Sequence, residues 1–335
     1  MSPWTGKNPR VSVVMPVYNC ARYLREAIES ILNQTFENFE FIIVNDGSTD
    51  ETPEILNTYA NKDSRIKIIN QPNSGLVIAL NRGIRETEGE WVFRMDGDDI
   101  SLSHRFAVQI EAIQKNPSLV LLGGWCRQIN EEGVPLKINR YPSSHDSLVH
   151  CLETIRPFFP HPTACFRKDI VIRIGGYRER FPPAEDVDLW LRLIVEGEIA
   201  CIENVILQLR KHKDNISIRA DRLQQLRSVA ARICHFRRKA GLSDLSKMEE
   251  DVWQGFVKWV EERLEGEGYF RRIQGWQALW NAWYSNLDVN KFKRTMLVLK
   301  ILMQNPSARK AFLKRFKEDD LILGLAEESR GIFNS

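Results

Sequence analysis

The chain has 335 residues, of which 43% are hydrophobic and 27% charged, and its formal net charge is +3. This length allows one large core or one domain with a helical extension, and the small net charge does not favour a nucleic-acid-binding protein. The six scattered cysteines include no Cys-x-x-Cys pair, so we expect reduced thiols. Residues 1–10 lack the apolar core of a signal peptide, and no window approaches about 18 apolar residues. We therefore expect a cytoplasmic protein without a membrane span.

Strands and helices alternate through the first hundred residues. Short apolar runs typical of buried strands occur at Val11–Val17, 39–44, 66–69 and 91–95. Helical signals lie between them, at 23–32, from Thr52 with Pro53, and at Leu76–Glu86. This order predicts an α/β fold with a Rossmann-like, mostly parallel sheet that is flanked by helices.

The second half of the chain is less regular. We expect helices over 104–115, 144–155 and 187–194, a hairpin over 128–139, and strand segments at 119–125, 163–166, 200–205 and 207–212. From Leu223 onward the pattern is helical, with apolar stripes at Trp253, Phe256, Val257 and Val260 and at Trp276, Leu279, Trp280 and Trp283. The predicted domains are therefore 1–218, divided near residue 100, and a helical C-terminal region over 219–335.

Polar turns follow three of the predicted parallel strands. They are Tyr18-Asn19, Asp46-Gly47-Ser48 and Asp96-Gly97-Asp98. The carboxyl ends of parallel strands share one edge of the sheet, where ligands bind in open α/β folds. Carboxylates that converge there suit Mg²⁺ or Mn²⁺ with a bound phosphate. The alternative for the third turn is an ordinary solvated acidic turn.

Two later features also allow two interpretations. Glu185-Asp186 precedes a predicted helix, where acidic residues serve either as caps or, in an active site, as a general base. His212 lies between Lys211 and Lys213 and is either a surface histidine or a metal ligand facing Asp98.

Taken together, these residues resemble the family 2 glycosyltransferases of the GT-A fold. The resemblance covers about 11–217 and rests on an ordered set of motifs: Val17-Tyr18-Asn19, Asn45-Asp46-Gly47-Ser48, Asn73-Ser74-Gly75 with the segment 80–84, Met95-Asp96-Gly97-Asp98-Asp99, Gly175-Gly176-Tyr177 and Glu185-Asp186 at the start of 185–190. Two positions depart from the family pattern, since Asn45 and Leu80 stand where many members have Asp and Arg.

The resemblance implies a role for each matching residue. The donor nucleotide sugar would contact Pro16, Val17, Tyr18, Asn19, Asp46, Asn73, Asp96, Gly97 and Asp98. Asp46 would accept a hydrogen bond from the base, and Asp98, with Asp96 and His212, would hold Mg²⁺ or Mn²⁺ on the diphosphate. Asp186 would be the catalytic base, and the acceptor would contact Gly176, Glu185 and Trp190.

The implied activity is inverting transfer of a sugar from a nucleotide sugar to a hydroxyl of a glycan or lipid-linked acceptor, as in synthesis of a cell-envelope polysaccharide. The choice between UDP, dTDP and GDP stays open, with a preference for UDP because Asp46 suits a pyrimidine N3–H. The alternative is a non-catalytic nucleotide- or glycan-binding protein on the same fold. The basic stretch 286–317 either packs on the core or binds anionic lipid peripherally at the inner face of the plasma membrane.

Overall fold

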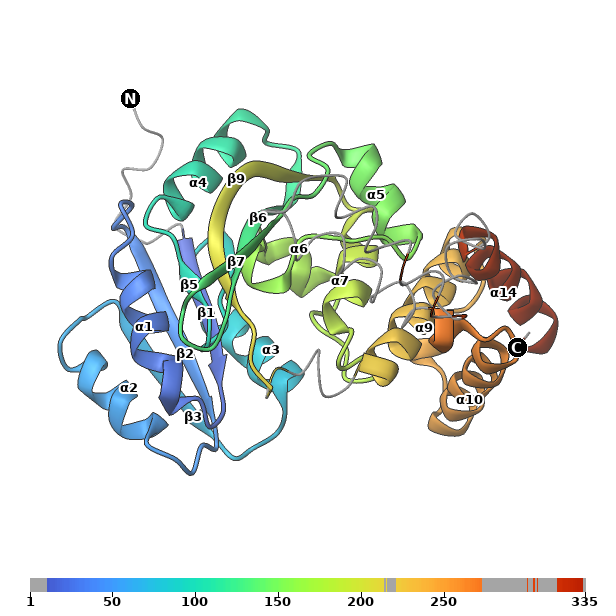
Figure 1. Cartoon of the computed structure of the whole chain (residues 1–335), viewed down its shortest axis with the longest axis horizontal. Coiled ribbons are helices and arrows are strands. Elements are labelled where there is room, and N and C mark those ends of the chain that lie inside the picture. Colours follow the sequence, from blue (N-terminus) through green and yellow to red (C-terminus); the bar gives the residue numbers. More distant parts are fainter. Residues whose placement is uncertain are drawn as a thin grey trace. The chain divides into compact units, whose positions relative to one another are not determined.

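A computed structural model describes residues 11–213, 215, 221–272 and 318–333, together with the single positions 300, 304 and 306. The chain divides into two compact units. The first contains Met1–Leu152 and Arg156–His212, and the second contains Glu153–Ile155 and Lys213–Ser335 (Figure 1).

The first unit is built on a nine-stranded sheet. Its strands are β1 (Val11–Val17), β2 (Phe39–Asp46), β3 (Ile66–Gln71), β4 (Trp91–Arg94), β5 (Ile100–Ser101), β6 (Leu119–Ile129), β7 (Pro135–Asn139), β8 (Cys165–Arg167) and β9 (Glu198–Arg210). The order is β3-β2-β1-β4-β8-β6-β9-β5, with β7 paired to β6. Strands β1 to β4 pair in parallel, whereas β8 is antiparallel to both β4 and β6.

The helices of this unit lie between the strands in the sequence. They are α1 (Ala21–Leu32), α2 (Thr52–Ala60), α3 (Leu76–Glu86), α4 (Arg105–Lys115), α5 (His145–Glu153), the 3₁₀ turn η1 (His161–Thr163), α6 (Lys168–Arg173) and α7 (Glu185–Leu193). The predicted α/β fold with alternating strands and helices is confirmed.

Strand β1 shows why the sequences of the central strands are continuous apolar runs. Its alternate side chains face opposite layers of the unit. Val13 and Met15 belong to the same core cluster as Leu24 and Ile28 of α1. Val14 instead faces α3, where a Cβ added to Gly83 would lie 2.6 Å from Val14 Cγ1. All seven residues of β1 are buried, so apolar side chains are needed on both faces.

Three elements differ from the expectation. The two strand segments predicted after residue 200 form one strand, β9, whose exposed Glu203 and Asn204 interrupt the apolar pattern. The two-residue strand β5 and the short helix α6 were not predicted, because each is too short to show a periodicity.

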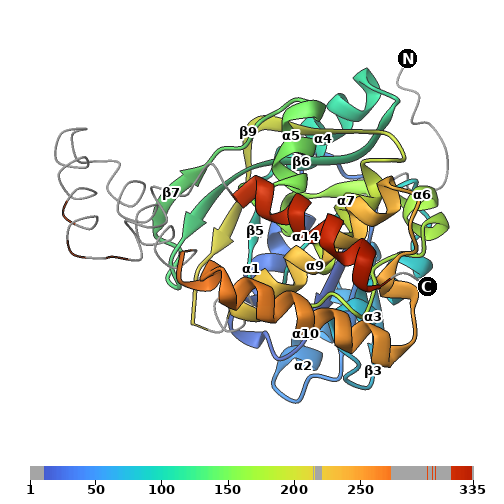
Figure 2. The same cartoon turned by 90° about the vertical axis from the view of Figure 1, so that its right-hand side faces the viewer.

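The described part of the second unit contains α9 (Asp221–Lys239), η2 (Leu245–Lys247), α10 (Glu250–Gly266) and α14 (Glu318–Ile332), and Figure 2 shows α9, α10 and α14. The predicted stripe of Trp253, Phe256 and Val260 is buried on α10. Arg237 of α9 is 1% exposed and donates to carbonyl oxygens of Ser243, Ser329 and Phe333 within this unit.

Part of the predicted tail lies outside the described residues. This applies to Trp276, Leu279, Trp280 and Trp283 and to the basic stretch 286–317, apart from positions 300, 304 and 306. Among the helices that the structure describes, none combines the length and the hydropathy needed to cross a bilayer. All six cysteines are free thiols.

Candidate functional site

The acidic turn begins where β4 separates from β1. The last bond of this ladder runs from Met95 N to Val14 O, at 3.1 Å. Pro16 has no N–H for the next bond, so the chain is free to leave the sheet after Met95. The turn then rests against the end of β1, because a Cβ added to Gly97 would lie 3.1 Å from Val17 Cγ1 and 3.0 Å from Cys20 Sγ. Pro16 and Gly97 therefore place the acidic turn at the edge of the sheet.

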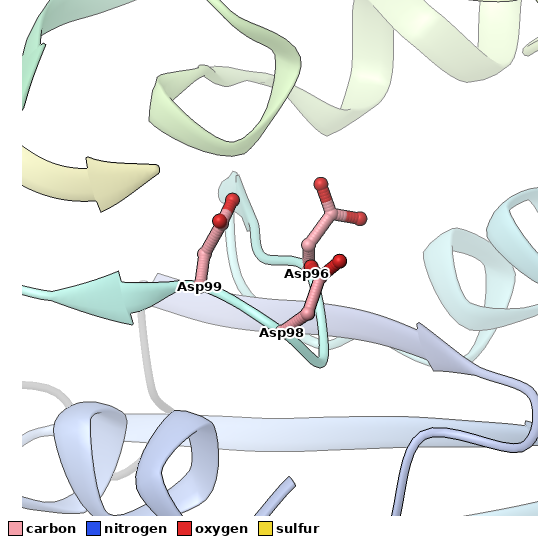
Figure 3. A group of neighbouring side chains, drawn as sticks. All are labelled: Asp96, Asp98 and Asp99. Carbon is pink, nitrogen blue, oxygen red and sulfur yellow. The ribbon is translucent and has the colours of Figure 1, made fainter. Parts of the chain in front are cut away.

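Three carboxylates gather on this turn. One oxygen from each of Asp96, Asp98 and Asp99 lies within 4.8 Å of the others, and the three side chains extend to the same side (Figure 3). Asp96 pairs with the buried guanidinium of Arg94, the last residue of β4. His212 Nε2 lies 2.8 Å from Asp98 Oδ2, so the predicted neighbourhood of these two residues is present.

Burial and mutual repulsion both act on the carboxyl groups of this turn. Burial raises the pKa of Asp96, with a further contribution from Asp98 that Arg94 opposes. The pKa of Asp99 is raised well above its usual range, first by burial and then by Asp98 and Asp96. Asp99 Oδ1 accepts a bond from Arg210 N, whereas its buried Oδ2 has no hydrogen-bond partner among the described residues. Like charges packed in this way favour a bound cation.

The Tyr18-Asn19 turn is tied to the turn after β2. Asn19 N donates to Ser48 Oγ at 3.0 Å, and Asn19 Oδ1 accepts from Thr49 N at 2.8 Å. Asn19 adopts a φ of 48°, a left-handed conformation that Asn tolerates better than most residues. Tyr18 beside it is 51% exposed. The two turns therefore form one surface on which Tyr18 is accessible.

Asp46 holds the loop that leads into α3. Its carboxylate accepts hydrogen bonds from Gln71 Nε2 at 2.7 Å and from the backbone N–H groups of Ser74 and Gly75, both at 2.9 Å. Next to it, Gly47 adopts a φ of +74°, and a Cβ there would lie 2.6 Å from Asn73 N. The loop containing Asn73 therefore packs against the turn that follows β2, and most of the Asp46 acceptor capacity is used inside the protein.

The Gly175-Gly176 corner is fixed by two side chains, the half-buried Asn81 and the buried Arg192. Asn81 on α3 donates to Tyr177 O and accepts from Tyr177 N, both at 2.8 Å. Arg192 on α7 donates to Gly176 O at 2.7 Å and pairs with Asp188. Asp186 and Asp188 of α7 therefore lie in different environments. Asp188 is completely buried and ion-paired, whereas Asp186 is only partly buried.

We expect Arg192→Met to lower the free energy of unfolding by about 3 kcal/mol, because it removes the close partner of the buried Asp188 carboxylate and leaves only Arg178, whose Nη1 lies 3.7 Å from Asp188 Oδ1. Urea denaturation measures this change. Arg173→Met is the control, because Arg173 is an exposed arginine paired with Glu196 at 2.9 Å and its loss should change stability by no more than about 1 kcal/mol. Equal losses of unfolding free energy in the two variants would contradict a stabilising role of the buried Arg192–Asp188 pair.

Glu185 is the first residue of α7 and is only 5% exposed. Burial, followed by the neighbouring charge of Asp186, raises its pKa from 4.5 to about 7. Between these two pH values the folded state holds a proton that the unfolded chain has released, so stability falls as the pH rises through this window.

Glu185→Gln removes this titration. Relative to the wild type, the unfolding free energy of the variant should rise by roughly 2–3 kcal/mol between about pH 5 and pH 8. Denaturant melts across this range measure the difference. Parallel pH profiles of the two proteins would show that the pKa of Glu185 is not raised.

Trp190 is 1% exposed and forms part of an aromatic core. Its ring centroid lies 5.7 Å from that of His161 and 6.0 Å from that of Phe166. We therefore leave Trp190 out of the acceptor surface.

The sequence analysis did not identify Arg94 and Arg192 as parts of the site. A charged residue inside a buried apolar run was a usable signal, because such a residue needs an ion-pair partner.

The chain is similar in sequence to known proteins. Residues 12–175 match the family model described as Glycosyl transferase family 2. The putative glycosyltransferase EpsE of Bacillus subtilis (strain 168) is 37% identical over 196 residues, covering 57% of this chain and 69% of that protein. The O-antigen biosynthesis glycosyltransferase WbnJ of Escherichia coli is 37% identical over 190 residues, covering 56% and 72%.

Two solved structures share the fold at low sequence identity. S. aureus TarS 1–349 in complex with UDP-GlcNAc has a TM-score of 0.56 at 22% identity, covering 74% of this chain and 70% of that one. The mannosyltransferase PcManGT from Pyrobaculum calidifontis, in complex with GDP-Man and Mn²⁺, has a TM-score of 0.54 at 17% identity, covering 96% and 87%.

Proposed function

The chain belongs to glycosyl transferase family 2 and has its GT-A fold, and from this premise we propose that it transfers a sugar, with inversion, from a nucleoside-diphosphate sugar to a hydroxyl of a glycan or lipid-linked acceptor. The observation that carries the proposal is the turn of Asp96, Asp98 and Asp99 with His212 beside it. The first unit contains every residue to which we assign a role.

Asp98, Asp96 and His212 are suited to hold Mg²⁺ or Mn²⁺. Two adjacent ligand atoms at about 2.1 Å from an octahedral ion lie about 3 Å apart. The 2.8 Å between His212 Nε2 and Asp98 Oδ2 is close to that spacing. Burial and, after it, the charge of Asp98 raise the pKa values of Asp96 and Asp99, and a divalent cation beside these carboxylates would favour their charged forms. When bound, the ion would stabilise negative charge on the departing diphosphate.

We propose that the nucleoside binds over the joined turns that follow β1 and β2. The exposed ring of Tyr18 and the backbone of Val17 and Asn19 line this surface. Asp46 still has acceptor capacity beyond its three internal bonds, which suits the N3–H of uracil and favours a UDP-sugar. TarS is described as bound to UDP-GlcNAc and PcManGT as bound to GDP-Man, so UDP and GDP are the first two nucleotides to compare.

We assign proton removal from the acceptor hydroxyl to Asp186. A carboxylate that takes this proton as the hydroxyl attacks lowers the barrier by general-base catalysis. Glu185 beside it is buried with a raised pKa, so near neutral pH the pair need not carry two full charges. If Asp186 acts as a base and not as a nucleophile, the acceptor oxygen displaces the nucleotide directly and the anomeric configuration inverts.

The experiment is to incubate the full chain with UDP-, dTDP- and GDP-sugars, with Mn²⁺ or with a chelator, and to measure nucleoside-diphosphate release by mass spectrometry. An extract of cell-envelope glycans supplies acceptors, since WbnJ is described as an O-antigen biosynthesis enzyme. We expect release from one donor class that requires Mn²⁺. Donor binding without any release or transfer would instead favour a non-catalytic binding protein.

A further inference from the structure

We propose that Arg210 is a positioning residue that fixes the metal-binding groups of this site. The proposal rests on the proposed function, because it concerns the same site. Arg210 is the last residue of β9, and its side chain is only 2% exposed. It lies two residues before His212, and its backbone and side chain both reach the acidic turn.

Two hydrogen bonds join Arg210 directly to that turn. Its backbone N–H donates to Asp99 Oδ1 at 2.8 Å, and its Nε donates to the backbone oxygen of Asp98 at 2.9 Å. These bonds fix the orientation of one carboxylate and the backbone from which the other extends. Asp98 therefore projects from a chain segment whose position Arg210 determines.

The far end of the same guanidinium is anchored in two other parts of the unit. Nη1 donates to Glu131 O, in the connection between β6 and β7, at 2.9 Å. Nη2 pairs with Glu26 of α1 at 2.5 Å. Arg210 thus links the acidic turn to two segments that are distant in sequence, the β6–β7 connection and α1.

Arg210 also supports His212 through an aromatic ring. Its guanidinium carbon lies 4.5 Å from the ring centroid of Tyr23, and that ring lies 5.2 Å from the ring of His212. His212 in turn contacts Asp98. One buried side chain therefore restrains the orientation of both Asp98 and His212, the two groups with the ligand-like spacing described above.

The contacts require an arginine rather than any cation. The guanidinium is planar and presents donors in fixed directions, and it stacks on an aromatic face. Arg210 uses Nε, Nη1 and Nη2 toward different partners while it lies over Tyr23. The single ammonium group of lysine cannot reach all of these acceptors, so Arg210→Lys keeps the positive charge but loses most of these contacts.

The test compares the Mn²⁺ concentration that gives the half-maximal UDP-induced thermal shift in the full-length wild type and in Arg210→Lys. Loss of groups that orient metal ligands typically weakens metal affinity by about 10- to 100-fold, and we expect an increase of that size. Saturating Mn²⁺ should restore most of the shift. Arg237→Lys is the matched control, because Arg237 is equally buried but donates within the second unit. It should lower stability without changing the Mn²⁺ requirement.

A wild-type Mn²⁺ requirement in folded Arg210→Lys would overturn the inference while leaving the proposed function standing. Absence of any Mn²⁺ response in the wild type would reject the proposed metal site and this inference with it. If Arg210→Lys does not fold, Glu26→Gln is decisive, because the Glu26 side chain is 62% exposed and its change removes only one anchor. It should raise the Mn²⁺ requirement by a smaller factor, and an unchanged requirement would overturn the inference.

Discussion

Replacing Asp186 with Asn is expected to lower the rate of sugar transfer by about 10²- to 10⁴-fold, the usual contribution of a general base. The amide matches the carboxylate in shape, and its oxygen still accepts the bond that Asp186 Oδ1 receives from Val187 N at 2.7 Å. It cannot take a proton from the acceptor hydroxyl. The loss should therefore appear in kcat, while the KM for the donor stays near its wild-type value.

The control for this change is Asp169→Asn, which makes the same acid-to-amide substitution in the first turn of α6. Asp169 is 61% exposed and pairs with Arg167, so its variant should transfer sugar at the wild-type rate. Steady-state kinetics with saturating donor and acceptor compare the three proteins. A folded Asp186→Asn enzyme that keeps the wild-type kcat would show that Asp186 is not the catalytic base.

Replacing Asp98 with Asn is expected to lower transfer by at least about 10²- to 10³-fold and to weaken donor binding as well. The change removes a charged group that we assign to the metal, so both the ground state and the transition state of the diphosphate lose stabilisation. This distinguishes Asp98 from Asp186, whose loss should affect only the chemical step.

The stability of Asp98→Asn provides an independent check. Asp98 raises the pKa values of both Asp96 and Asp99, which means that its charge repels theirs. Removing this charge should leave the melting temperature of the metal-free protein unchanged or higher. A melting temperature well below that of the wild type would show that Asp98 mainly stabilises the fold, and would make its loss of activity uninformative.

The sequence predicted the positions of most secondary structure because local patterns determine them. Helix α3 has the bounds that its periodicity indicated, and the buried strand β1 required apolar residues on both faces. The acidic turn was also predictable, since charged residues cannot remain inside a buried strand. The strand–helix order then brought the polar turns to one edge of the sheet.

The supports of the site were not predictable, because they join residues that are far apart in the chain. Arg210 contacts the turn across 112 residues, and Asn81 clamps Tyr177 across 96. Nothing in the local sequence distinguishes Arg210 from its basic neighbour Lys211. Likewise, the helical position of Trp190 did not reveal that its ring packs into the core rather than toward a ligand.

The measurement that tests the central claim most directly is a thermal-shift panel of UDP, dTDP, GDP and CMP, with and without Mn²⁺, on the wild type and on Asp98→Asn. A ligand that binds the folded state raises its melting temperature by mass action. We predict a shift for one nucleoside diphosphate only when Mn²⁺ is present, and its loss in Asp98→Asn. A well-folded wild type that responds to no nucleotide under either condition would contradict the account.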